Sequence, residues 1–321
     1  MQTLTFFRFF CIVKILLFCK NFMKTNLIFK IIRIIVFVIP ILAQNASSLD
    51  LRQDEITFYQ NPDTQFNYAV HLMGKSRFYD AITEFKRFLY FHPNDSRYWQ
   101  AEYNIAVCYR QGGHWKTAIS ILEETIENGQ PSALVNQAQM MLGRTLIRNH
   151  QANLSRLEFD DLINFSDLKS EAMYWKGWSY IYQFNWQAAA KVFARLAKLA
   201  PNKYLNAAND LFTFCDQEKS ATRKSPGKAK MLSRFLPGVG QMYAGRIKNG
   251  LIASALNGTF AYYTINALLA KRFLDAAIIY YLFWYRYYGG NVNNAKNFAY
   301  EFNQRQNETA LQQLQAQYGK P

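Results

Sequence analysis

The sequence has few of the residues that bind metals or perform nucleophilic catalysis. Among its 321 residues are four cysteines and four histidines. Cys108 and Cys215 are far apart in helical patterns, as is typical of small buried residues, and the other two cysteines lie near the N-terminus. The histidines are scattered, and neither His-Glu-x-x-His nor Cys-x-x-Cys occurs. We therefore expect no metal site, no cofactor and no enzymatic activity.

Acidic residues are also scarce, and unevenly so. The net charge is +15, yet residues 44–216 carry only about −1. Residues 1–43 contain six Lys or Arg and no acid, and residues 217–321 carry +10. Because the positive charge lies at the two ends, beside apolar runs, it favours a membrane over nucleic acid as the partner.

The N-terminus has the layout of an export signal. After Met23, three basic residues precede the nine apolar residues 34–42 and the small residue Ala43. Nine residues are too few to span about 30 Å of hydrocarbon. We interpret residues 1–43 as a leader cleaved before Gln44, with Met23 as the true start. The alternative is that two apolar stretches of this region form a membrane hairpin.

The middle of the chain contains a repeat. "FYDAITEFKRFLYFHP", "HWKTAISILEETIENGQP" and "NWQAAAKVFARLAKLAP" each have an aromatic residue, an alanine three positions later, a large apolar residue four positions after that, and a final proline. "NLSRLEFDDLINF" is a weaker copy. The small anchors are Ala81, Ala118, Ser155 and Ala189, and the helices before them carry Ala69, Ala106, Gly143 and Gly177. Small residues on facing helices allow close antiparallel packing.

These features resemble the tetratricopeptide repeat, of the type found in bacterial envelope proteins, over about residues 62–203. The resemblance implies an all-α fold, an α-solenoid of four helical hairpins, with 204–218 as its capping helix. The alternative is a set of unrelated helical hairpins.

Repeats of this family bind peptides in a groove lined by the first helix of each unit. Carried onto this chain, the groove positions are Phe66, Val70, Met73, Tyr103, Val107, Arg110, Met140, Arg144, Ile147, Tyr174, Trp178 and Ile181. The Lys and Asn that clamp a carboxylate in chaperone-binding members are missing. The groove is therefore apolar and aromatic with two arginines, and we expect a protein or peptide partner with an apolar segment. The alternative is that some of these aromatic residues only pack between units.

The second half opens with "PGVGQMYAGRIKNG", followed by the apolar residues 251–270, a basic turn and the aromatic stretch 273–288. The pattern lacks the Gly-Lys-Ser/Thr ending of a phosphate loop. It resembles a two-helix membrane domain with the signature Pro-Gly-x-Gly-Gln-x-Tyr-x-Gly. The signature residues are Pro237, Gly238, Gly240, Gln241, Tyr243 and Gly245. The first apolar stretch is long enough to cross a bilayer.

An alternative for this region is a helical domain with two buried helices, because Asn257, Asn266 and Asp275 lower its hydropathy. Intramembrane polar groups are also candidates for function, which keeps open an enzyme with a site in the hairpin.

The predicted organisation has six parts. These are the leader 1–43, a connecting segment 44–61, the solenoid 62–218, a basic linker 219–234, the hairpin 235–290 and a polar helical tail 291–321. They predict a non-enzymatic, membrane-tethered scaffold of the bacterial cell envelope. The alternative is a subunit of an apparatus for membrane-protein insertion or envelope assembly.

The side of the membrane follows from two opposed signals. An export signal places the repeats in the periplasm, whereas the six positive residues of the linker 219–234 favour the cytoplasm. We favour inner-membrane attachment with periplasmic repeats, since a translocated domain carries its own signal. The basic linker is then expected to contact anionic lipid headgroups.

Overall fold

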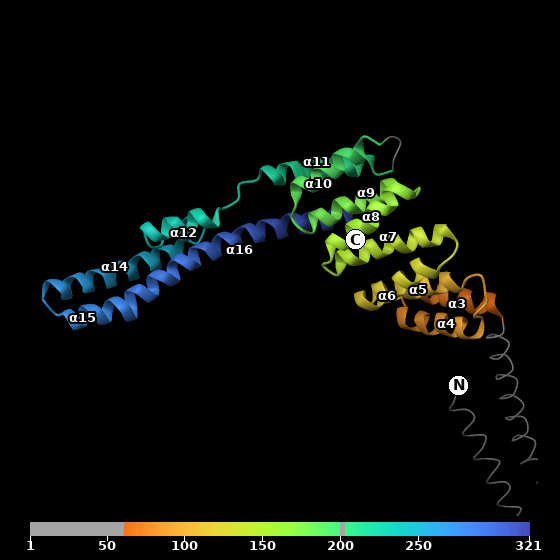
Figure 1. Ribbon diagram of the computed structural model, residues 1–321, viewed down its shortest axis with the longest axis horizontal. Helices are drawn as coiled ribbons and strands as arrows, with labels where there is room; N and C mark the ends of the chain where they lie inside the picture. Colours follow the sequence, from red (N-terminus) through yellow and green to blue (C-terminus); the bar gives the residue numbers. More distant parts are fainter. Residues whose placement is uncertain (1–60, 200–202) are drawn as a thin grey trace, which may run out of the picture. The chain divides into compact units, whose positions relative to one another are not determined.

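The structure is a computed structural model that describes residues 61–199 and 203–321. The expected leader, the start at Met23, the cleavage site before Gln44 and the connecting segment up to residue 60 lie outside the described residues. Every regular element in the described part is a helix, as the all-α prediction requires (Figure 1). The chain divides into two compact units, Met1–Tyr98 and Trp99–Pro321, which are treated separately below.

The described part of the first unit is a helical hairpin of α3 (Pro62–Gly74) and α4 (Phe78–Phe91). Asn61 begins α3, because its side-chain oxygen accepts hydrogen bonds from the backbone N–H groups of Asp63 and Thr64. Ala69 and Ala81 are fully buried. The small residues expected at the contact of the two helices are therefore inside the hairpin.

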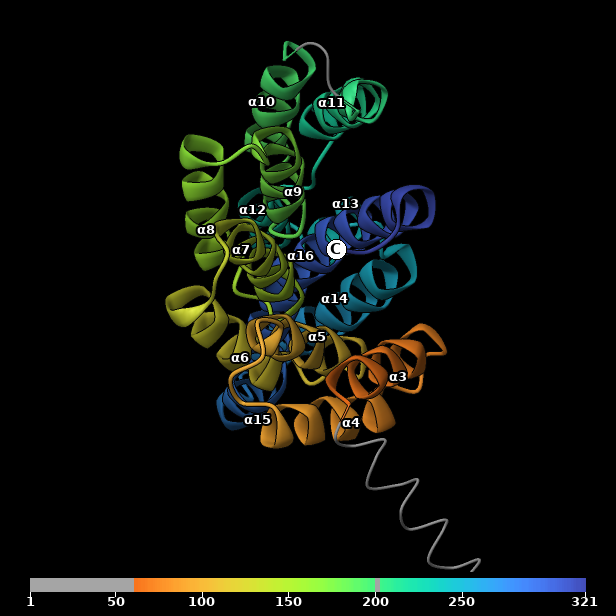
Figure 2. The same ribbon diagram turned by 90° about the vertical axis from the view of Figure 1, so that its right-hand side faces the viewer.

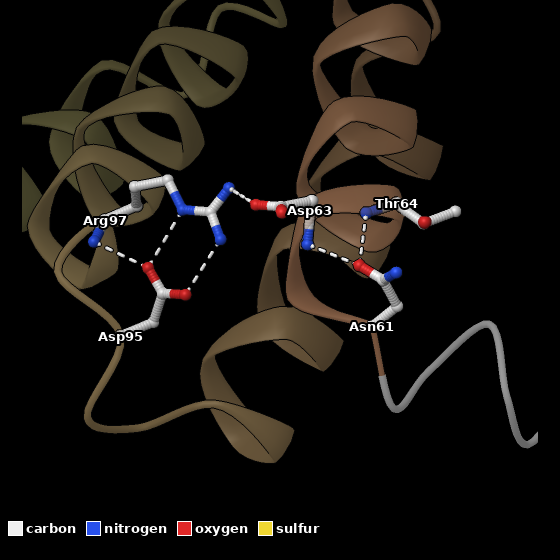
Figure 3. Close-up of polar contacts among 5 residues, drawn as sticks. All are labelled: Asn61, Asp63, Thr64, Asp95 and Arg97. Atoms are coloured by element: carbon white, nitrogen blue, oxygen red, sulfur yellow. Dashed lines mark hydrogen bonds and ion pairs between the residues drawn. The ribbon is translucent and has the colours of Figure 1, made fainter.

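A polar network holds the end of this unit to the start of α3 (Figure 3). Asp95 accepts hydrogen bonds from the backbone N–H and the guanidinium of Arg97, at 2.8–2.9 Å. The other arm of Arg97 reaches Asp63 at 2.7 Å. The hydrogen bonds from Arg97 lower the pKa of Asp95 to about 2. The carboxylate is therefore ionised at neutral pH and fixes the turn that follows α4.

The second unit begins with seven helices that pack in chain order (Figure 2). They are α5 (Tyr98–Gln111), α6 (Trp115–Asn128), α7 (Ser132–Arg148), α8 (Ala152–Phe165), α9 (Lys169–Ile181), α10 (Trp186–Ala197) and α11 (Leu205–Ser220). The helix α11 packs against α10 and buries Ala208, Leu211 and Cys215. It thus lies where the capping helix 204–218 was predicted.

The glycines of the third and fourth repeats make room for aromatic rings. A Cβ added to Gly143 would lie 2.5 Å from the ring of Phe159, and one added to Gly177 would lie 2.3 Å from the ring of Phe193. Both phenylalanines are fully buried. In each of these repeats, the glycine of the first helix therefore lies against the large residue of the second helix, four positions after the small anchor. The repeat pattern alone did not specify this contact.

The rest of the second unit consists of α12 (Pro226–Phe235), α13 (Val239–Tyr243), α14 (Ile247–Leu269), α15 (Phe273–Ile278), a π-helix η2 (Ile279–Trp284) and α16 (Tyr285–Tyr318). The predicted linker 219–234 thus contains a helix. The predicted boundary between the hairpin and the tail, at residue 290, falls inside the 34-residue helix α16.

The signature residues serve close packing. Gly238 has φ of +96°, and a Cβ there would lie 2.1 Å from the carbonyl oxygen of Gly250. A Cβ on Gly240 would lie 1.9 Å from the carbonyl oxygen of Ala229. Only glycine permits these approaches of α13 to α12 and α14.

The other signature residues make polar contacts around the same junction. The Pro237 carbonyl accepts a hydrogen bond from Ser254, the Tyr243 hydroxyl accepts one from the Ser225 backbone N–H, and Gln241 donates to Asn291. Gly245 ends this segment with φ of +85°.

The expected membrane hairpin is present as a pair of helices, α14 and α15–η2. Within the described residues, however, none of the helices combines the length and the apolar character needed to cross a membrane. The structure therefore does not confirm a membrane crossing by residues 251–270. Polar residues contribute to this result, since Asn257 and Thr264 are buried within α14.

Replacement of Gly177 tests the repeat packing. We expect Gly177→Ala to lower the free energy of unfolding by about 1–3 kcal/mol, because the new methyl group overlaps the ring of Phe193. Gly258→Ala is the matched control, since Gly258 also lies inside a helix but has open space around an added Cβ. Thermal unfolding measures both. Equal midpoints for the two variants would show that the predicted helix contact is wrong.

Candidate functional site

The last turns of α16 lie against the fourth repeat. Ala310 and Leu314 of α16 share one buried cluster with Trp178 and Ile181 of α9. The ring of Tyr318 lies 6.4 Å from that of Trp178, edge to face. The C-terminal helix of the chain therefore covers residues that the family resemblance assigns to the peptide groove.

Three hydrogen bonds join the same two parts. Asn307 accepts from the Trp186 indole at 3.0 Å, Gln315 donates to the Tyr182 hydroxyl at 2.9 Å, and Tyr318 donates to Asp210 at 3.1 Å. The first two of these hydrogen bonds join neutral groups, and the third ends on the carboxylate of Asp210. No ion pair joins α16 to the described residues of α9, α10 or α11. The contact thus depends on a small apolar patch and a few directional bonds.

This packing corrects the groove prediction for the fourth repeat. Tyr174, Trp178 and Ile181 are 6%, 0% and 0% exposed. All three are therefore buried in the folded chain, where Tyr174 lies against Phe193 and Tyr204. Trp178 lies against Tyr318 of α16. The sequence contained a signal for this packing, because α16 carries Ala310, Leu314 and Tyr318 at helical spacing.

The third repeat requires a similar correction. Met140 and Ile147 are buried in a cluster with Phe159, Leu162 and Ala172. They belong to the interior between successive helices. Of the predicted positions on α7, only Arg144 is partly exposed.

The positions nearer the N-terminus are more open. In the first unit, Phe66 and Met73 are partly exposed and Val70 is 36% exposed. In the second unit, Tyr103 and Val107 of α5 are partly exposed. These positions keep the apolar and aromatic character predicted for the groove.

Two arginines with an unpartnered Nε atom lie beside Tyr103. Arg110 is 7% exposed, and the Nε atoms of Arg110 and Arg144 are buried with no hydrogen-bond partner among the described residues. The Arg144 guanidinium lies 4.4 Å from the ring centre of Trp175. A buried donor without a partner costs about 1–3 kcal/mol, so the two Nε atoms are unfavourable features of this cluster.

The pKa values reflect this crowding of positive charge. Burial, followed by repulsion from Arg144 and Arg148, lowers the pKa of Arg110 to about 10. Burial also lowers the pKa of Arg144, while Glu171 acts in the opposite direction. Burial raises the pKa of Tyr103, so its hydroxyl stays protonated beside the arginines.

The groove prediction missed three residues of this cluster. Arg148 follows Arg144 by one helical turn, and Glu171 and Trp175 come from α9. The spacing of Arg144 and Arg148 was a readable signal, whereas the contribution of α9 depends on how the repeats stack.

The polar residues of the hairpin do not converge. Asn257 is buried and donates to the Ala253 carbonyl of its own helix. Asn266 is exposed, and Asp275 pairs with Arg272 at 3.5 Å on the surface. Among the described residues, no group of three or more His, Cys, Asp or Glu is placed to hold a metal ion.

Detachment of the last turns of α16 is a direct test of this contact. We expect Leu314→Asp to lower the protection of amides 307–318 against hydrogen exchange by at least about 30-fold, because burying a charge there costs about 2 kcal/mol or more. Gln312→Asp is the control, since Gln312 is exposed on the same turn. Similar protection in the two variants would mean that Leu314 does not hold α16 to the repeat.

The comparisons with known proteins concern the repeats. A family model described as "Tetratricopeptide repeat" matches residues 100–128 and 171–203, which are the α5–α6 and α9–α10 pairs. A solved structure of a Podosopora anserina putative kinesin light chain with nearly identical TPR-like repeats is similar at 11% identity and a TM-score of 0.43, covering 51% of this chain and 88% of that one. No curated protein matches. Residues 100–128 and 171–203 thus match the tetratricopeptide repeat, in a chain whose described regular elements are all helices.

Proposed function

We propose that this protein is a membrane-attached scaffold that binds a protein segment on its second and third repeats. The observation that carries the proposal is the cluster of Arg110, Arg144 and Arg148 beside the partly exposed Tyr103. Tetratricopeptide repeats generally bind protein partners, and this positive cluster suits an acidic side chain. The partner therefore carries an acidic residue next to an apolar segment.

The occupied fourth repeat supports the same assignment. Because α16 covers Trp178 and Ile181, an outside segment has access to α5 and α7 but not to that part of α9. The binding surface of the proposed scaffold is accordingly shorter than the four-unit groove implied by the family resemblance.

Substitution of the arginines tests the partner surface. A photo-crosslinking residue at Tyr103 is expected to capture a polypeptide that the same residue at the exposed Glu124 does not capture. With the captured partner purified, Arg110→Gln with Arg144→Gln should weaken binding about 10- to 100-fold per lost charged hydrogen bond. Arg195→Gln, at an exposed arginine of α10, is the control. Unchanged affinity in the double variant would exclude this surface.

The hairpin is the proposed membrane attachment. Large apolar residues near its turn are strongly exposed, among them Leu269 at 79% and Leu274 at 80%. Lys271 and Arg272 lie between them, and more positive residues precede α14. An apolar tip bordered by positive charge suits an anionic membrane surface. We infer inner-membrane attachment, with the repeats in the periplasm of a bacterial envelope.

Two measurements test this part of the proposal. Leu269→Asp with Leu274→Asp should lower the membrane-bound to free ratio at least tenfold, since each leucine contributes roughly 1.5–3 kcal/mol when buried. Asn293→Asp with Asn297→Asp adds the same charge at exposed positions of α16 and should leave the ratio unchanged.

Alkaline phosphatase fused after Asp216 reports on which side of the membrane the repeats lie, since its activity requires export. An inactive fusion would place the repeats in the cytoplasm.

A further inference from the structure

A cleft runs between α14 and the helix that returns beside it. Its volume is about 610 Å³, within the roughly 300–1,000 Å³ of small-molecule sites. Along the cleft, residue numbers rise in one helix and fall in the other, because the chain reverses direction at Lys271. The cleft therefore has one end near the hairpin turn and the other near α13.

The two ends of the cleft differ in chemistry. Toward the turn it is lined by Leu256, Leu282 and Phe283, and toward α13 by the amide side chains of Gln241 and Asn291. The Gln241 amide donates to the Asn291 side-chain oxygen at 3.3 Å. The Asn291 side-chain nitrogen is buried and has no hydrogen-bond partner among the described residues. A spare donor thus lies at the polar end.

A positive charge lies between the two ends. Arg286 lines the cleft, and none of the lining residues is acidic. Arg286 takes part in none of the ion pairs formed within the described residues. The cleft therefore offers a guanidinium and an amide donor to an anion, and has no carboxylate to compete for them.

Gly290 lines this cleft and adds no side chain to it. It lies inside α16, where glycine costs about 1 kcal/mol relative to alanine. A Cβ added at Gly290 would meet no atom within 4 Å, as is also true of Gly258 and Gly289. No contact within the described chain thus requires glycine at these positions, in contrast to Gly238 and Gly240. Of the three, only Gly290 lines the cleft, so a larger side chain there would take up space in it.

The helix geometry changes at the apolar end. Leu282 and Phe283 belong to the π-helix η2, and helical irregularities of this kind are frequent at functional sites. Leu282 is 63% exposed and Phe283 44% exposed, so the apolar end opens onto the exposed apolar surface of the hairpin. A long apolar chain could extend from the cleft along that surface.

We propose that this cleft binds one phospholipid with an anionic headgroup. The headgroup phosphate lies at Arg286 and the Asn291 amide, and an acyl chain follows Leu256, Leu282 and Phe283 toward the hairpin turn. The inference rests on the proposed membrane attachment only for the source of the lipid. It is independent of the partner surface on the repeats.

The test uses the full-length protein and dihexanoyl phosphatidylglycerol below its micelle concentration, so that no membrane surface is present. Isothermal titration should give saturable binding of one lipid per chain. Gly290→Leu fills the cleft and should weaken binding at least tenfold. Gly289→Leu is the matched control, because Gly289 also has open space around an added Cβ but does not line the cleft. Its affinity should equal that of the unmodified chain.

A second variant tests the headgroup. Arg286→Gln should weaken binding of phosphatidylglycerol about tenfold, from the loss of a charged hydrogen bond. Binding of dihexanoyl phosphatidylcholine should change less. Circular dichroism verifies that each variant keeps the helix content of the unmodified protein.

Several results would overturn the proposal. Unchanged affinity in both leucine variants would indicate general adsorption to the apolar hairpin, and equal weakening by both would indicate a shared effect on α16 and not a filled cleft. Equal affinity for free inorganic phosphate would indicate a simple anion site. A dimer in sedimentation that Gly290→Leu alone dissociates would make a second copy the occupant. Absence of phosphatidylglycerol binding would also exclude the lipid. If only the cleft inference is wrong, the protein would still attach to the membrane in cells. Attachment is tested separately by the substitutions at Leu269 and Leu274.

Discussion

The second unit depends on one continuous helix. α16 packs with Ala295 and Ala299 against α12 and α13, and with Ala310 and Leu314 against the fourth repeat. Small side chains at the first contact allow close helix approach, as in other tightly packed helix pairs. One helix, Tyr285–Tyr318, thus takes part in both contacts.

Uncompensated positive charge connects the two proposed sites. Among the described residues, Arg110 on the repeats and Arg286 in the hairpin cleft form no ion pair, and the only acidic residue acting on Arg144 is Glu171. Other arginines form ion pairs, such as Arg97 with Asp95 and Asp63 and Arg223 with Glu218. The positive net charge of +15 is thus not only a diffuse surface property, and part of it lies in pockets suited to anions.

The glycines fall into two groups according to the space around an added Cβ. Gly177, Gly238 and Gly240 lie so close to other atoms that a methyl group would overlap them. Gly289 and Gly290 have open space instead, although both lie inside α16. Composition alone treats these positions alike. Their neighbours decide which glycines the fold requires and which remain to be explained by function.

The sequence by itself determined the repeats, because their pattern is local. The aromatic residue, the small anchor and the large apolar residue recur within each helical hairpin, and α5–α6 and α9–α10 lie where that pattern predicts them. It did not determine the surface that remains open. Trp178 and Ile181 have the spacing of groove residues, but they are buried in one cluster with Leu314, more than 130 residues away in sequence. Apolarity likewise indicated a hairpin at 251–288, whereas the cleft beside Gly290 depends on the pairing of α14 with α16. Helical periodicity is encoded over a few turns, and contacts between distant helices are decided only by tertiary packing.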